Sequence, residues 1–188
     1  DYIINEDIPE SMHFINASTA KMDSLLSGLL TLSRLGRKNL SIETIDMNSL
    51  IKNVVSNFEY EIKEKGIDVE ISELPDCKGD AAHINQVFSN LINNAIKYLQ
   101  PDRPGRIKIF GQEDENQLHY YVEDNGIGIS HRQQEKIFKL FHQSNPDKSG
   151  IGLGLNIIKQ VLDRHDGEIE VQSEVDKGSK FIVKLPKK

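Results

Sequence analysis

The sequence predicts an α/β fold in which helices cover a mixed sheet, preceded by one long N-terminal helix. Three observations lead to this prediction. Apolar residues recur at steps of three and four near the N-terminus, as on one face of a helix. Several short segments after residue 40 alternate between apolar and polar residues, as strands do. Helical segments interleave with pairs of such strands, which is typical of a mixed sheet covered by helices.

The long helix is expected from about Pro9 to Gly36, because proline suits a first helical turn and glycine suits a helix end. One helix packed on its own domain could produce its apolar stripe. The length and seam-like spacing of the stripe favour packing against a partner chain. The seam positions are Ile15, Ser18, Met22, Leu25, Leu29 and Leu32, and Leu26, Leu30 and Leu35 widen the stripe.

The remaining elements follow in order along the chain. A glycine-punctuated stretch from 124 to 154 separates two groups of them. Before it we expect a strand at 40–45, a helix from about Asn48 to Lys65, a strand at 67–71, a helix at 80–98 capped by Asp80, and strands at 106–110 and 117–123. After it we expect a helix that ends near His165 and strands at 168–173 and 179–185.

The composition excludes some classes of protein. The 188 residues are 37% hydrophobic and 28% charged, which is typical of a globular protein and not of a disordered one. The net charge of -6, with both signs interspersed, argues against a nucleic-acid partner. Cys77 has no second cysteine to pair with, which favours a packing role and a reducing compartment. We expect a cytoplasmic catalytic part, and membrane anchoring of a longer protein stays open.

The helix at 80–98 has a row of polar side chains. Asn90, Asn94 and Lys97 fall on one face, with His83 two turns earlier. Because asparagine is a poor helix former, an amide row in the middle of a helix is unusual. Amide oxygens suit a hard cation such as Mg²⁺, which binds few protein groups and keeps several waters. A plain solvated face would explain the same residues about equally well.

Two glycine motifs follow. Asp124 directly follows a predicted strand and begins the segment DNGIGI, in which glycines let the backbone bend tightly. The carboxylate can accept a hydrogen bond from an exocyclic amine. The segment GIGLGL at 150–155 opens a helix and exposes N–H groups to which a phosphate can bind. Each motif alone is weak evidence, since a hairpin or bulge explains the first equally well and the second matches neither the P-loop nor the dinucleotide fingerprint.

Taken together and in order, these segments resemble the catalytic domain of sensor histidine kinases. Residues 90–98 are similar to the N box, 124–129 to the G1 box, 136–141 to the F box and 150–155 to the G2 box. Residues 174–186 resemble the closing hairpin of that family. Residues 32–37 resemble the end of the second dimerisation helix, most closely in the phytochrome-type branch.

The resemblance implies a Bergerat-type α/β sandwich, shared with gyrase, MutL and the heat-shock chaperones. It divides the chain into the end of a dimerisation and phosphotransfer domain (1–38) and a catalytic ATP-binding domain (39–188). Asn90, Asn94 and Lys97 are implied to be catalytic, with Asn90 and Asn94 at a Mg²⁺ ion. The implied ATP-binding residues are Asn94, Lys97, Tyr98, Asp124, Gly126, Gly128, Ile129, Phe141, Lys148, Gly150, Gly152, Leu153 and Gly154.

The resemblance also implies an activity and its partners. The domain would transfer the γ-phosphate of ATP to a histidine on a dimerisation helix outside this chain, for relay to a response-regulator receiver domain. The intact protein would be a homodimer. His13 is followed by Phe14, Ile15, Asn16 and Ala17, which supply neither the acidic neighbour nor the proline of the phosphoacceptor box. The box is therefore absent here, and the fragment should not phosphorylate itself.

Two positions depart from the family pattern, since His83 and Gln143 stand where arginine is frequent. They leave open the alternative that the chain is a degenerate module, which binds nucleotide or only a partner and catalyses nothing. A serine kinase or ATPase of the same superfamily is a further alternative, against which the leucine-striped helix argues.

Overall fold

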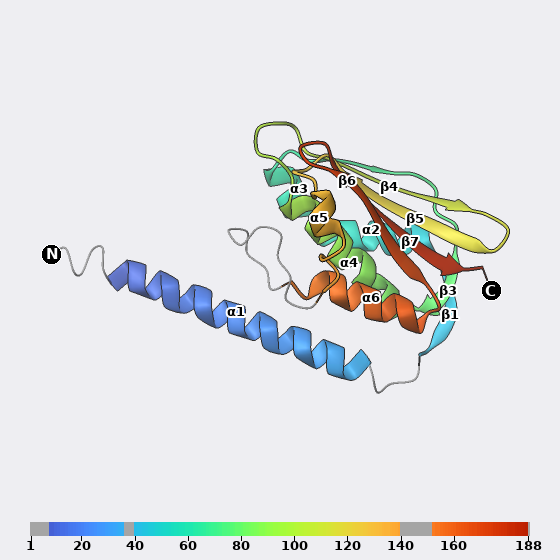
Figure 1. Ribbon diagram of the computed structural model, residues 1–188, viewed down its shortest axis with the longest axis horizontal. Coiled ribbons are helices and arrows are strands. Elements are labelled where there is room, and N and C mark those ends of the chain that lie inside the picture. The colour runs from blue at the N-terminus through green and yellow to red at the C-terminus, as the bar shows by residue number, and fades with distance from the viewer. Residues whose placement is uncertain (1–7, 36–39, 140–151, 188) are drawn as a thin grey trace.

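The computed structural model describes residues 8–35, 40–139 and 152–187 of the chain. In these ranges a long helix precedes an α/β domain (Figure 1). The helices are α1 (Ile8–Leu35), α2 (Met47–Ser56), α3 (Glu59–Glu64), α4 (Ala81–Lys97), α5 (His131–Gln134) and α6 (Gly154–Arg164). The strands are β1 (Ile42–Ile45), β2 (Asp68–Ile71), β3 (Cys77–Asp80), β4 (Arg106–Glu113), β5 (Gln117–Asp124), β6 (Glu168–Glu174) and β7 (Gly178–Pro186).

The strands form a five-stranded sheet in the order β2-β4-β5-β7-β6 and a separate two-stranded sheet of β1 and β3. In the large sheet β2 runs parallel to β4, and the other pairs are antiparallel. The large sheet is therefore mixed, as the sequence predicts. Asp124, the last residue of β5, lies opposite Ile107 of β4 and Ser179 of β7. Because both neighbouring strands pair with β5 up to its end, the position of Asp124 is fixed by the sheet.

Helices α2, α4 and α6 lie on one side of the large sheet, and the core lies between them and the strands (Figure 1). Ile107 and Ile109 of β4 and Tyr120 of β5 point into this core and are fully buried. Burying a large apolar side chain contributes about 1.5–3 kcal/mol, so the apolar face of α4 determines where its polar face points. The buried residues of α4 are Ile84, Val87, Phe88, Leu91, Ile92, Ala95 and Ile96.

A network of hydrogen bonds fixes the start of α4. Asp80 Oδ1 accepts from the backbone N–H of His83 (3.2 Å), which confirms the predicted cap, and Oδ2 accepts from that of Ser41 (3.1 Å). Buried His165 ends α6, as predicted, and its Nδ1 lies 2.7 Å from the carbonyl oxygen of Val161. Because a carbonyl only accepts, Nδ1 carries the proton, and Nε2 accepts from the backbone N–H of Asp80 (3.1 Å).

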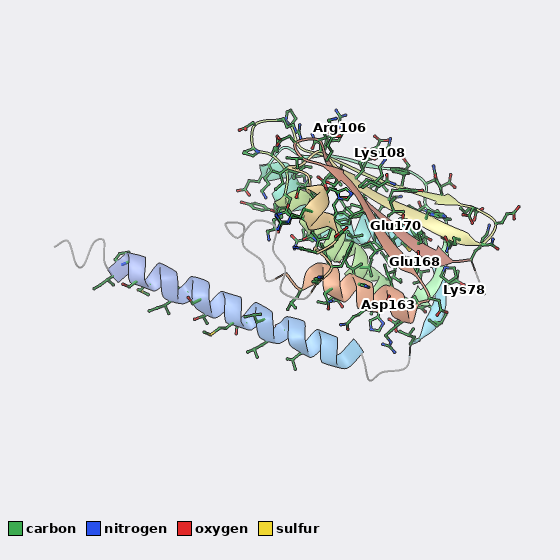
Figure 2. The ribbon with its side chains drawn as sticks, viewed as in Figure 1. Lys78, Arg106, Lys108, Asp163, Glu168 and Glu170 are labelled. Carbon is green, nitrogen blue, oxygen red and sulfur yellow. The ribbon has the colours of Figure 1, made fainter. Side chains whose placement is uncertain are left out.

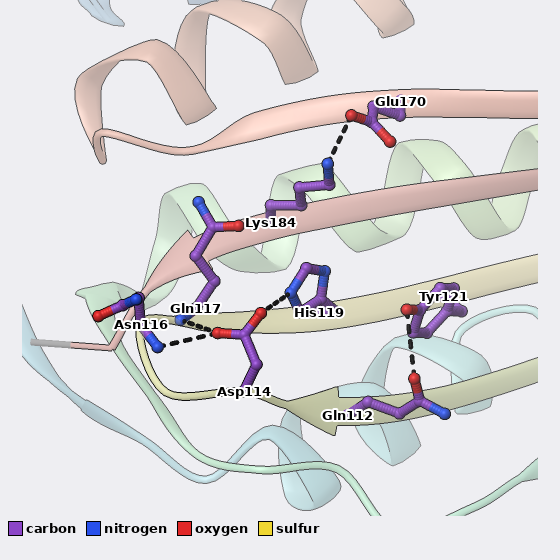
Figure 3. Close-up of polar contacts among 8 residues, drawn as sticks. All are labelled: Gln112, Asp114, Asn116, Gln117, His119, Tyr121, Glu170 and Lys184. Atoms are coloured by element: carbon purple, nitrogen blue, oxygen red, sulfur yellow. Dashed lines mark hydrogen bonds and ion pairs between the residues drawn. The ribbon is translucent and has the colours of Figure 1, made fainter.

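The outward side chains of β4, β5, β6 and β7 form polar contacts on the opposite face of the sheet (Figure 3). Lys184 pairs with Glu170, and the Tyr121 hydroxyl donates to Gln112 (3.3 Å). Asp114 accepts two backbone hydrogen bonds in its own turn, each at 2.8 Å. Exposed pairs of this kind contribute at most about 1 kcal/mol each. The stability of the domain therefore comes mainly from the core on the helical side.

Helix α1 lies along the helical side of the domain, next to α6 (Figure 1). Leu25 packs against the core, and a Cβ on Gly28 would overlap the side chain of Leu153. Leu25, a residue of the predicted seam, is thus partly buried against this domain. Six other large apolar side chains of α1 are at least 47% exposed, namely Ile8, Met12, Ile15, Met22, Leu26 and Leu30. Among the helices described, none is both long and apolar enough to cross a bilayer.

Three segments differ from the sequence prediction, and one of them is the short helix α5, which is not among the predicted helices. The single helix expected from Asn48 to Lys65 is two helices, α2 and α3. The backbone N–H groups of Asn57 and Phe58 bond to carbonyls three residues earlier (3.2 and 3.0 Å), which tightens the chain between them. The strand β3 is not among the predicted strands, and it forms by pairing with β1.

Candidate functional site

Asp124 is a buried carboxylate at the end of β5, with 8% of the residue exposed. Its Oδ1 accepts a hydrogen bond from the backbone N–H of Gly126 (2.8 Å). Burial raises the pKa of Asp124 to about 6, and hydrogen bonds from the backbones of Gly126 and Ser179 offset only part of this effect. A buried carboxyl with a raised pKa is more frequent in functional sites than elsewhere.

Gly126 and Gly128 shape the loop that follows β5. A Cβ on Gly126 would overlap the carbonyl oxygen of Tyr98, and one on Gly128 would overlap that of Glu174. Gly128 also has a φ of 70°, which L side chains rarely adopt. The sequence interpretation assigned the two glycines to close approach of a ligand. The atoms that they approach in the structure belong to the backbone of the chain itself, which fixes the loop on two sides.

Side chains outside the predicted motifs also hold this loop. Arg103 donates to two carbonyl oxygens of the loop, each at 2.9 Å. At the end of the loop, the backbone N–H of Ile129 donates to Ser173 Oγ, and the carbonyl of Ile129 accepts from Gln134 Nε2, both at 2.8 Å. The sequence analysis missed Arg103, Ser173 and Gln134. No local pattern marks Arg103 and Ser173, because they meet the loop through the tertiary structure. Gln134 lies only five residues after Ile129, and no local pattern marks it either.

The polar face of α4 carries the next group of predicted residues. Asn90, Asn94 and Lys97 are all partly buried on this face. The Lys97 ammonium lies 4.8 Å from the centre of the Tyr98 ring, within cation–π distance. The structure thus places the predicted amide row and lysine together, with Tyr98 at the end of the helix.

Two contacts join α4 to the glycine motifs. The carbonyl of Tyr98 accepts from the backbone N–H of Ile127 (3.0 Å), which connects the end of α4 to the loop after β5. Asn90 Nδ2 makes a long hydrogen bond to the carbonyl of Gly154 (3.5 Å), which connects the middle of α4 to the start of α6. Three motifs that are far apart in the sequence therefore meet along α4.

The start of α6 contains Gly152, Leu153 and Gly154. Gly152 has a φ of 72°, a conformation that favours glycine. Leu153 is 4% exposed and packs in the core beside α1, so its side chain has a structural role here. The predicted site residues Phe141, Lys148 and Gly150 lie outside the described residues, as does Gln143. Phe138 of the same region is partly buried against the core.

His83 and Cys77, which the sequence also singles out, have structural roles. His83 Nδ1 lies 3.8 Å from Asp80 Oδ1, and its ring meets that of His165 edge-on at 6.2 Å. His83 is four turns before Lys97, about 20 Å along the helix at 1.5 Å per residue. Burial raises the pKa of the Cys77 thiol to about 11, so the thiol stays neutral, as expected for a packing residue.

The donor set for a metal ion consists of amides. Within 8–35, 40–139 and 152–187, no three His, Cys, Asp or Glu side chains gather closely enough to hold a metal. Asn90 and Asn94 offer two amide oxygens on one helix face. Two neutral oxygens fit Mg²⁺, which binds few protein groups and takes its other ligands from phosphates and water. They would hold a metal poorly without a phosphate ligand.

Comparisons with known proteins identify the family. Residues 79–188 match the model of the histidine kinase-, DNA gyrase B- and HSP90-like ATPases. The chain is 38% identical to cyanobacterial phytochrome B of Nostoc over 173 residues, which cover 89% of this chain and 23% of that protein.

Two solved kinases have the same architecture. Full-length ShkA in complex with AMPPNP superimposes with a TM-score of 0.77 at 26% identity, over 94% of this chain and 39% of that one. ThkA in complex with the response regulator TrrA gives 0.76 at 27% identity, over 93% and 51%.

The family match covers more than half of the chain, and the likeness to solved kinases confirms the expected Bergerat-type sandwich. The chain spans about a quarter of the length of the first curated relatives, 25% and 23%. The protein belongs to the histidine kinase-, DNA gyrase B- and HSP90-like ATPases, and its α/β domain is the ATP-binding catalytic domain of a sensor histidine kinase.

Proposed function

We propose that this domain binds ATP along the polar face of α4, with the adenine amine donating a hydrogen bond to Asp124. In the intact protein it then transfers the γ-phosphate to a histidine on a dimerisation helix outside this chain. One observation carries the proposal: the buried Asp124 carboxylate is incompletely compensated by hydrogen bonds, and its loop is joined to the end of α4 at Tyr98. An amine donor is the partner that such a carboxylate lacks.

The other predicted residues take their roles from this placement. Lys97 contacts a phosphate, and the exposed N–H groups at the start of α6 bind another. The remaining nucleotide contacts are assigned to Tyr98, Gly126, Gly128, Ile129, Phe141, Lys148, Gly150, Gly152, Leu153 and Gly154. No carboxylate stands on the polar face at positions 90, 94 and 97 to activate a water. This favours transfer to a separate acceptor over hydrolysis.

Asn90 and Asn94 would hold Mg²⁺ against the phosphates through their amide oxygens. The ion would neutralise charge on the phosphates and orient them. Asn94→Ala should therefore weaken ATP binding about tenfold or more when Mg²⁺ is present, by loss of one ligand to a charged group. It should change binding little when the metal is chelated. Calorimetric titration with ATP in the two conditions measures this, and equal losses in both would assign Asn94 a structural role.

The N-terminal helix supports the proposed division into 1–38 and 39–188. Six large apolar side chains of α1 are at least 47% exposed, whereas Leu25 and Gly28 pack on the domain. Such a helix suits a bundle with a second copy of the chain, so the intact protein is a homodimer. The ThkA complex supports a response-regulator receiver domain as the second partner. The phytochrome-type branch and a cytoplasmic location of the catalytic part belong to the same proposal.

The transferase proposal is tested with γ-labelled ATP. The fragment alone should bind ATP and remain unlabelled, because transfer requires an acceptor held in line with the γ-phosphate. Base-stable, acid-labile label should appear after a separate dimerisation helix with a phosphoacceptor histidine is added.

The control variant is His13→Ala, which removes the one histidine of the N-terminal segment. Label on the fragment alone that disappears in His13→Ala would contradict the proposal and make the chain a self-contained kinase. No label in either mixture, with ADP still bound, would favour the degenerate module.

A further inference from the structure

The loop between α4 and β4 contains an arginine that contacts three backbone carbonyls. Arg103 Nε donates to the carbonyl of Asn125 (2.9 Å), and Nη2 donates to those of Gly126 (2.9 Å) and Asp176 (2.8 Å). The first two carbonyls belong to the loop after β5, and the third belongs to the turn between β6 and β7. One planar guanidinium thus joins three loops that lie side by side at one end of the sheet (Figure 1).

Arg103 is connected to the carboxylate of Asp124 through the two peptide units that flank Gly126. The carbonyl of Asn125 accepts from Arg103 Nε and belongs to the same planar peptide unit as the N–H of Gly126, which donates to Asp124 Oδ1 (2.8 Å). The carbonyl of Gly126, in the next unit, accepts from Nη2. If the Asn125 carbonyl loses its partner, this peptide unit can rotate and carry the Gly126 N–H away from Asp124. The orientation of the carboxylate therefore depends on Arg103, although the two side chains belong to different loops.

The chemistry of these contacts indicates that Arg103 positions the backbone of the loop after β5. Within the described part of the chain, no carboxylate lies within ion-pair distance of Arg103. The guanidinium donates its hydrogen bonds to backbone carbonyl oxygens instead. Five donors in a fixed fork are suited to holding several carbonyls in one relative arrangement. The positive charge of Arg103 also lowers the pKa of Asp124, against the larger effect of burial.

We propose that Arg103 is a positioning residue for adenine recognition, which holds the Gly126 peptide so that Asp124 keeps the orientation needed to accept the adenine amine. This inference rests on the proposed role of Asp124. It assigns Arg103 no contact with the nucleotide.

The test compares two nucleotides by calorimetric titration. ADP has the exocyclic amine, whereas inosine diphosphate has a carbonyl oxygen there and offers Asp124 no amine donor. The wild-type protein should prefer ADP. Arg103→Ala should lower ADP affinity about tenfold, the low end for one charged hydrogen bond, and leave inosine diphosphate affinity nearly unchanged. The preference for ADP should therefore fall.

Arg106→Ala is the matched control. It removes the same charge three residues away, from an exposed position on β4 (Figure 2) whose side chain is 71% exposed. Both affinities should equal those of the wild-type protein. In the Asp124→Asn background, Arg103→Ala should cause no further loss of ADP affinity, because the two residues act through one contact.

A purely structural role for Arg103 predicts equal losses for both nucleotides, and that result would overturn the inference. If Arg103→Ala does not fold, Arg103→Gln is measured in the same way, and an unchanged preference for ADP would overturn the inference too. A wild-type protein that binds both nucleotides equally would instead refute the proposed role of Asp124. The two failures are thus distinguishable.

Discussion

Two aspartates of this domain stand at similar junctions and differ in their surroundings. Asp80 lies between β3 and α4, and Asp124 lies at the end of β5. Burial raises the pKa of Asp80, but hydrogen bonds from the backbones of Ser41 and His83 outweigh it, and the net pKa is lowered. At Asp124 burial is deeper, and it raises the pKa to about 6 despite the backbone hydrogen bonds.

The difference distinguishes a structural carboxylate from the carboxylate to which we assign adenine recognition. Ionised Asp80 has the donors that it needs and stabilises the fold. Ionised Asp124 lacks part of the compensation, so in the nucleotide-free protein its charge lowers stability. A ligand amine would supply the missing donor. The comparison teaches that the degree of hydrogen-bond compensation, and not burial alone, separates the two roles.

The first prediction concerns pH. Adenine binding through Asp124 uses the ionised carboxylate, so ADP affinity should be high above about pH 6 and fall as the pH drops through this value. With a pKa of about 6, affinity near pH 5 should be roughly tenfold lower than near pH 8. Calorimetric titration across this range measures it. Asp124→Asn is the control, because the ADP phosphates titrate in the same way with both proteins. An identical pH profile of ADP affinity in the variant would contradict the prediction.

The same pKa gives the opposite trend for stability. The folded-state pKa of Asp124 is raised above its ordinary value of 3.8, so the folded protein binds this proton more tightly than the unfolded chain. The contribution of this group to the free energy of unfolding is present below about pH 4 and is lost as the pH rises through about 6. Between about pH 4 and pH 6, nucleotide affinity should rise with pH, while the contribution of Asp124 to the free energy of unfolding falls.

The second prediction concerns Asp80. Asp80→Ala removes the cap of α4 and should lower the free energy of unfolding by about 1 kcal/mol, measured by urea unfolding near neutral pH. The dissociation constant for ADP should stay unchanged, because Lys97 and the loop after β5 lie at the other end of α4. Asp163→Ala is a matched control on the exposed surface of α6 (Figure 2), with an expected change within about 0.5 kcal/mol. Weaker ADP binding in Asp80→Ala would show that the two ends of α4 are coupled.

The sequence predicts most of the fold because its patterns are local. The apolar periodicity of α4 and α6 and the alternation in β4, β5 and β7 identify these elements directly. The break between α2 and α3 has no glycine or proline to mark it. The strand β3 contains Gly79 and two polar residues, and it depends on pairing with β1, which is a tertiary effect.

The site shows the same division between local and tertiary signals. Asp124, Gly126 and Gly128 form a recognisable motif, and the structure places them at one buried corner. Arg103 meets that corner from the loop between α4 and β4, and Ser173 meets it from β6. The incomplete compensation of Asp124 follows from its depth in the sheet and could not be predicted from residue types. Leu153 belongs to the glycine motif, yet packing against α1 and the core accounts for its position.

The most direct test of the account is urea unfolding of Asp124→Asn with and without saturating ADP. Without ADP, the variant should be more stable than the wild-type protein near pH 8, because an uncharged group replaces an incompletely compensated charge. With the same concentration of ADP, the wild-type protein should gain more stability than the variant, since stabilisation by a ligand increases with the logarithm of its affinity for the folded state. A variant that is less stable without ADP and gains as much from ADP as the wild-type protein would contradict the account.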